Sequence, residues 1–214
     1  MLLNKCPNAI QIYDKIFDIE TNARLWLNIS IQLSKVNNAY QVIDILFSAI
    51  KNKKDINEEY NNKLLEKLYW FLNCGKTNNE IKAESEKATS GSNEKLYSFE
   101  KDDTLIFSAF YRTYKIDIEA ELDTLHWWKF MAMFNDLDEK SKLVGVYMYY
   151  RGLDINESSI YKHASEREKQ KILEMKNFVS LESKNIGSNI DNAEEEKIRL
   201  ERLKILEAKN GNRN

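Results

Sequence analysis

The sequence has 214 residues, which is long enough for one sizeable hydrophobic core or two small ones. Hydrophobic residues make up 43% and charged residues 31%, a composition typical of a well-solvated globular protein and not of a wholly disordered chain. The formal net charge is −2, with 32 basic and 34 acidic residues intermixed, which argues against binding to nucleic acid or to an anionic membrane.

The chain opens with a predicted β-hairpin. Residues 9–13 and 16–19 are two short β-prone runs, and Asp14-Lys15 between them has the length of a tight turn. Ile10 and Ile12 would share one face of the first strand.

Three helices are predicted after the hairpin. Thr21 or Asn22 can cap the first, and its apolar residues fall on one helical face: Leu25, Trp26, Ile29 and Leu33. The second covers about 39–50 and the third about 57–74, where Gly75 occupies the position of a C-cap glycine. Hairpin and helices together form a predicted N-terminal module of residues 1–76.

A polar stretch divides the chain. Residues 77–95 are rich in Asn, Glu, Lys and Ser and offer almost nothing large to bury, so we predict a flexible linker. A second helical module is predicted over 96–178, with helices at about 101–114, from Asp123 or Thr124 to about 137, at 141–151 and at 165–178. Residues 179–214 are predicted to form a polar linker and a charged helix or tail. Helical propensity is highest over 193–209. The predicted fold class is therefore mainly α, with helical bundle modules and a short N-terminal β-hairpin.

Motifs that carry chemistry are scarce. Gly75-Lys76-Thr77 lacks the upstream glycine of a phosphate-binding loop, and no histidine pair or cysteine cluster has metal-ligand spacing. Asp102 and Asp103 suit the start of a helix better than a metal or acid–base site. Cys6 and Cys74 lie far apart and are expected to be reduced, partly buried thiols. We predict no enzyme activity, no cofactor and no metal site.

The strongest candidate for function is the aromatic run around Leu125–Phe130. Adjacent residues on a helix point about 100° apart, so Trp127 and Trp128 cannot both lie on a narrow stripe. Either both fill the core, or one of them faces a groove or a second subunit. His126 is expected to be packed or hydrogen-bonded, with partner contact as the alternative. The candidate partner-binding residues are His126, Trp127, Trp128, Phe130 and Phe134.

Several ordered blocks of sequence carry a resemblance to a known family. They are Trp70-Phe71-Leu72-Asn73-Cys74-Gly75-Lys76, Tyr97-Ser98-Phe99-Glu100-Lys101-Asp102, Leu125-His126-Trp127-Trp128-Lys129-Phe130 and Tyr150-Arg151-Gly152-Leu153-Asp154-Ile155. Together they resemble the gene product fifteen family of siphophages and prophages of low-GC Gram-positive bacteria. The resemblance is specific from about Trp70 to Phe178 and does not extend beyond about Ser180.

The resemblance implies a tail assembly chaperone: a helical protein, not an enzyme, that binds the tape-measure protein and helps tail-tube subunits polymerise around it. The implied partners are the tape-measure protein and, as a second candidate, the major tail protein, with a homo-oligomer left open. The implied location is the cytoplasm of the bacterial host, outside the mature virion. An alternative is a phage-encoded helical binding protein that captures a host or defence protein. A neighbouring tail-tube gene and a very long tape-measure gene would favour the chaperone.

Overall fold

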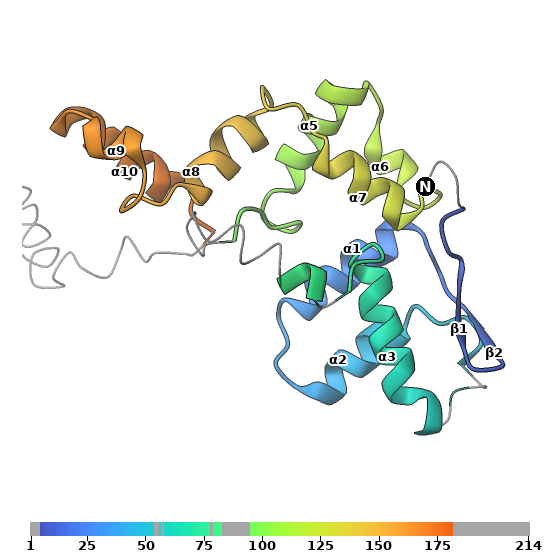
Figure 1. Ribbon diagram of the computed structural model, residues 1–214. Helices are drawn as coiled ribbons and strands as arrows, with labels where there is room; N and C mark the ends of the chain where they lie inside the picture. The colour runs from blue at the N-terminus through green and yellow to red at the C-terminus, as the bar shows by residue number, and fades with distance from the viewer. Residues whose placement is uncertain (1–4, 54–55, 57, 78, 83–94, 182–214) are drawn as a thin grey trace, which may run out of the picture. The chain divides into compact units, whose positions relative to one another are not determined.

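The structure, a computed structural model, describes residues 5–53, 56, 58–77, 79–82 and 95–181. Contacts group the described residues up to Val179 into one compact unit. This unit is mostly helical and contains a two-stranded antiparallel sheet, which confirms the predicted fold class (Figure 1). Most of the tail predicted over 179–214 and most of the linker predicted over 77–95 lie outside the described residues.

The hairpin pairs strand β1 (Ala9–Ile12) with strand β2 (Lys15–Asp18), and Ile10 lies opposite Phe17. Ile10 and Ile12 are both buried, as the alternation predicts, and β1 packs against helix α3 (Glu58–Leu72). The predicted position of the turn is wrong by one residue, because the two turn residues are Tyr13 and Asp14. Tyr13 has a φ of 53°, the left-handed conformation that tight hairpin turns require at their first central position.

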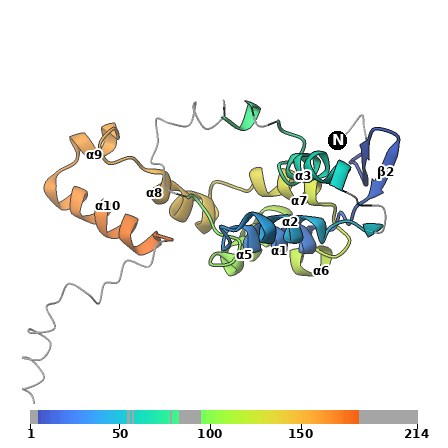
Figure 2. The same ribbon diagram turned by 90° about the horizontal axis from the view of Figure 1, so that it is seen from below.

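Helices α1 (Ala23–Leu33), α2 (Ala39–Phe47) and α3 (Glu58–Leu72) follow, with α1 packed on α2 and α2 on α3 (Figures 1 and 2). The side chain of Asn22 caps α1 by accepting the backbone N–H of Leu25 at 2.9 Å. Gly75 follows the end of α3 with a φ of 87°, but Cys74 before it is also left-handed, with a φ of 55°. The N–H of Cys74 donates to the Phe71 carbonyl and that of Gly75 to the Trp70 carbonyl, so the left-handed C-cap position falls on Cys74, one residue before the predicted glycine.

The second half of the unit contains helices α5 (Asp103–Tyr114), α6 (Ile118–Glu121), α7 (Trp127–Asn135), α8 (Tyr149–Gly152), α9 (Ser159–His163) and α10 (Glu166–Val179). The predicted start of the central helix at Asp123 or Thr124 is wrong, since α7 begins at Trp127 after the cap residue His126. The helix predicted at 141–151 is a π-helical segment, η3 (Leu143–Met148), followed by α8. Gly145 lies so close to the backbone of Glu139 that an added Cβ would clash with the Glu139 carbonyl oxygen.

Segments from before and after the predicted linker pack together. The backbone N–H of Ala23 donates to the Leu125 carbonyl at 2.8 Å, and the N–H of Trp127 donates to the Thr21 carbonyl at 2.7 Å. These bonds join the start of α1 to the start of α7, and the two helices contact each other. Trp26 and Phe130 consequently belong to one continuous hydrophobic core.

Candidate partner-binding site

His126 is the cap of α7. Its Nδ1 accepts the backbone N–H of Trp128 at 3.1 Å, and its Nε2 lies 2.9 Å from the Pro7 carbonyl oxygen. Because Nδ1 accepts a hydrogen bond, Nε2 carries the proton and the imidazole is neutral. Burial lowers the pKa of His126, while the hydrogen bond to Pro7 acts in the opposite direction. The packed, hydrogen-bonded alternative from the sequence therefore describes this residue.

The two neighbouring tryptophans join α7 to the end of α3. The indole N–H of Trp127 donates to the Leu72 carbonyl at 2.9 Å, and that of Trp128 donates to the Phe71 carbonyl at 2.9 Å. The last carbonyls of a helix have no partner within that helix. The Trp127 bond satisfies the Leu72 carbonyl, whereas the Phe71 carbonyl also accepts the backbone N–H of Cys74 at 3.0 Å. Trp128 also packs edge-on against Trp70, with ring centroids 5.2 Å apart.

Three of the five candidate residues form an aromatic stack in the core. Phe130 is stacked on Trp127 at 5.7 Å and on Phe134 at 6.2 Å, and all three side chains are no more than 4% exposed. His126 and Trp128 are half-buried at the end of α3. The role of these five residues in partner binding stays a prediction. An alanine at Trp128, the more exposed tryptophan, would remove packing against Trp70 as well as any partner contact.

A groove opens beside Phe130, between α1, α5, α6 and α7. Its volume is about 600 Å³. The buried side chains of Ile106, Ile118 and Phe130 line its inner part, whereas Phe107 is 40% exposed. The complete lining consists of Arg24, Leu27, Asn28, Ile31, Phe99, Glu100, Asp103, Thr104, Ile106, Phe107, Ile118, Glu119, Leu122 and Phe130. Sequence reasoning missed this groove because its walls are separated by about a hundred residues and come together only in the folded chain.

Charged side chains surround the apolar interior of the groove. Three lining residues carry carboxylates (Glu100, Asp103 and Glu119), and one, Arg24, carries a guanidinium. Arg24 pairs with Asp123 at 2.7 Å, just outside the groove. Both side chains of that pair are largely exposed, so water screens it. The groove thus has an apolar interior and a rim with an excess of negative charge.

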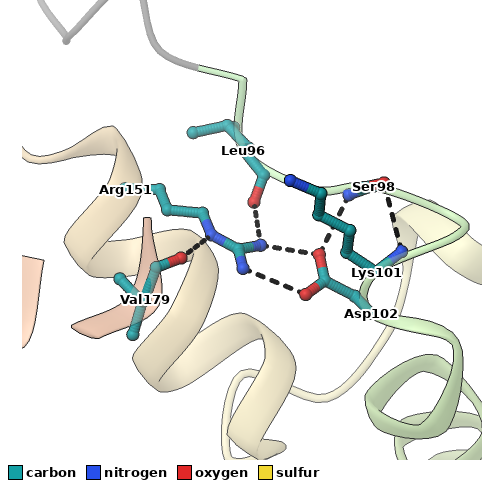
Figure 3. Close-up of polar contacts among 6 residues, drawn as sticks. All are labelled: Leu96, Ser98, Lys101, Asp102, Arg151 and Val179. Atoms are coloured by element: carbon teal, nitrogen blue, oxygen red, sulfur yellow. Dashed lines mark hydrogen bonds and ion pairs between the residues drawn. The ribbon is translucent and has the colours of Figure 1, made fainter. Parts of the chain in front are cut away.

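A buried ion pair lies elsewhere in the unit (Figure 3). Arg151 on α8 makes a bidentate pair with Asp102 at 2.6 and 3.0 Å, and both side chains are 3% exposed. Arg151 also donates to the carbonyls of Leu96 and Val179, and the N–H of Ser98 donates to Asp102 (Figure 3). The pair therefore joins the start of α5, helix α8 and the end of α10.

Among the described residues, no group of three or more His, Cys, Asp or Glu side chains converges as metal ligands do. No described helix is both long and apolar enough to cross a membrane. Cys6 and Cys74 are free and half-buried, as predicted. Burial raises the pKa of the Cys74 thiol to about 11.

A comparison with family models matches residues 2–181 to the family described as Bacteriophage Gp15 protein. The match covers most of the chain, so the protein belongs to this bacteriophage family, and the resemblance inferred from the sequence is confirmed. Searches of curated proteins and of solved structures gave no match.

The sequence blocks that carry the resemblance contact one another in the fold. Block 70–76 meets block 125–130 through the tryptophan N–H groups, which donate to the last carbonyls of α3. Block 97–102 meets block 150–155 through the ion pair of Asp102 and Arg151. These contacts give the blocks a structural role, whatever further role they have.

Proposed function

We propose that this protein is a tail assembly chaperone that binds the tape-measure protein while the phage tail forms. The observation that carries the proposal is membership of the Gp15 family over residues 2–181. The groove between α1, α5, α6 and α7 supports it, because an open apolar groove with a polar rim suits an amphipathic helix. Tail-tube subunits are the second candidate partner.

On this proposal the protein acts in the cytoplasm of the host by binding alone, without a catalytic step or a cofactor, and it leaves before the virion matures. A long, partly apolar tape-measure chain aggregates unless its apolar surface is covered. A chaperone with an open groove covers such surface. The tape-measure chain later replaces its contacts with the chaperone by contacts inside the tail tube. Moderate affinity at each site permits that release.

Co-expression tests the proposed function. The full chain should keep the tape-measure protein of its own phage soluble and should elute with it in size-exclusion chromatography. The same tape-measure protein expressed alone should precipitate. A tape-measure protein that stays soluble alone and elutes apart from this chain would contradict the proposal.

A further inference from the structure

We propose that the groove between α1, α5, α6 and α7 is a docking site for one basic amphipathic helix of a partner polypeptide. The inference deepens the proposed function, on which it rests for the identity of that partner. It concerns the place and the chemistry of binding, which family membership does not specify.

The length of the site matches a helix. One face of α1 and its C-cap lines the hollows at helical spacings of three and four residues, through Arg24, Leu27, Asn28, Ile31 and the C-cap residue Ser34. A second hollow of about 200 Å³ continues the groove and shares Ile31, Phe99 and Glu100 with it. Helix α1 has 11 residues, which corresponds to about 16 Å of wall. A partner helix of about three turns can lie against such a wall.

The apolar groups offer anchoring contacts in the groove. Leu27, Ile31 and Leu122 are half-buried, and the Phe107 ring is 40% exposed in the absence of a partner. Phe107 lies on the wall formed by α5, and the buried ring of Phe130 lies deeper. Apolar side chains at every third and fourth position of a docked helix would cover these groups. Burial of an aromatic ring that is already held by a rigid helix is a common source of hot-spot binding energy.

The rim selects the sign of charge on the partner. Asp103 is exposed and has no ion-pair partner among the described residues, and Glu119 is exposed at the start of α6. Glu100 pairs with Lys35 at 2.6 Å, but both side chains are about half exposed, so the pair can exchange partners at little cost. Lysine or arginine on both sides of the apolar stripe would complement these carboxylates, whereas acidic flanks would be repelled. The occupant that this rim favours is therefore a basic amphipathic helix.

Three labelled peptides of 18 residues test the proposal against the full chain by fluorescence anisotropy. The first has leucines on one helical stripe and lysines beside it. The second replaces every lysine with glutamate, and the third keeps the lysines but replaces every leucine with serine. We expect the first to bind and the other two to bind at least about tenfold more weakly. Equal affinity of the first two, binding of the third as strong as the first, or no binding at all would overturn the proposal.

Two substitutions locate the binding surface. Phe107→Ser should weaken binding of the first peptide by about tenfold or more, since it removes an anchor. Tyr40→Ser is the matched control, because Tyr40 is 80% exposed on α2 and does not line the groove. Far-ultraviolet circular dichroism should show the same helix content in both variants. Equal loss of binding in the two variants, or none in either, would overturn the proposal.

Rim charge is tested separately. The double variant Asp103→Lys with Glu119→Lys should prefer the glutamate peptide, so that the order of the first two affinities is reversed. An unchanged order would overturn the assigned charge. A chain that is dimeric in solution and becomes monomeric on Phe107→Ser would place a second copy in the groove and would also overturn the proposal.

The outcomes separate this inference from the proposed function. If the tape-measure protein co-purifies equally well with the Phe107→Ser chain and with the unaltered chain, the groove is not its docking site, whereas the proposed chaperone function still stands. If the chain binds the lysine peptide but not the tape-measure protein, the groove is a docking site for a basic helix, whereas the proposed chaperone function is contradicted.

Discussion

His126 couples the start of α7 to pH. The folded state lowers the pKa of this histidine below its ordinary value of 6.5, because burial disfavours the charged ring. The neutral ring therefore contributes stability that is fully present above pH 6.5 and is lost as pH falls from there through the lowered folded pKa. Protonation of Nδ1 would also remove the acceptor for the Trp128 N–H.

We expect the melting temperature of the chain to fall when the pH is lowered from about 7 to about 5. His126→Asn should show a smaller fall, because asparagine is a good helix cap that does not titrate. His163→Asn is the matched control, since His163 is exposed at the end of α9. Scanning calorimetry at both pH values measures the difference. An equal fall in the unaltered chain and in His126→Asn would contradict the assignment.

Gly75 is held between a left-handed backbone and an indole ring. Its φ is 87°, and an added Cβ would lie 2.9 Å from Cη2 of Trp128. We expect Gly75→Ala to lower the free energy of unfolding by about 1–3 kcal/mol, measured by urea denaturation. The control is Gly152→Ala, whose Cβ would meet only the flexible end of Leu96, at 3.0 Å. A larger loss at Gly152 than at Gly75 would contradict this account.

Residues whose role is local were predictable from the sequence, and those with distant partners were not. The positive φ of Gly75 after α3 and the helix cap at Asn22 could be predicted from neighbouring residues. Asp102 was predicted as helix-start charge, yet its carboxylate pairs with Arg151, 49 residues away. His126 was expected to be packed or hydrogen-bonded, but its role as a cap depends on where the preceding turn ends.

At the scale of elements, the pair of Arg151 and Asp102 holds three helices together. Removing one member leaves the other charge buried without its partner, which costs about 3–5 kcal/mol in comparable cases. We therefore expect Arg151→Met to lower the free energy of unfolding by about that amount. Urea denaturation followed by circular dichroism measures it.

Lys35→Met is the matched control for Arg151→Met, because it removes a pair with Glu100 whose side chains are 53% and 52% exposed. That exposed pair should contribute at most about 1 kcal/mol. A loss for Arg151→Met no larger than the loss for Lys35→Met would show that the buried pair does not hold the helices.

Segments whose apolar residues recur at helical spacing were correctly predicted to be helices. Helices α1, α2 and α3 fall where the spacing of apolar residues placed them, although α2 ends at Phe47 instead of Ile50. The π-helical segment η3 escaped prediction because its apolar pattern also suits an α-helix, and the close approach of Gly145 to Glu139 is visible only in space. Helix α9 is short and polar and gave no periodic signal.

For the whole molecule, the structure changes the place where a partner is expected. The sequence pointed to the aromatic run at 125–130. In the fold, the two tryptophans of that run donate hydrogen bonds to the last carbonyls of α3, and Trp127 and Phe130 are buried in the core. The groove borders the same core at Phe130, but its exposed ring is Phe107 and its charged rim comes from α5, α6 and the segment before α5. Such a surface cannot be read from local patterns, because it depends on how helices distant in sequence pack.

Hydrogen–deuterium exchange of the full chain, with and without the tape-measure protein of the same phage, tests the central claim most directly. We expect slower exchange on binding in α1, α5 and α6, the helices around the groove, and little change in α2. Phe107→Ser should reduce that protection. Unchanged exchange in α1, α5 and α6 while the tape-measure protein is bound, with protection confined to other helices, would contradict the claim.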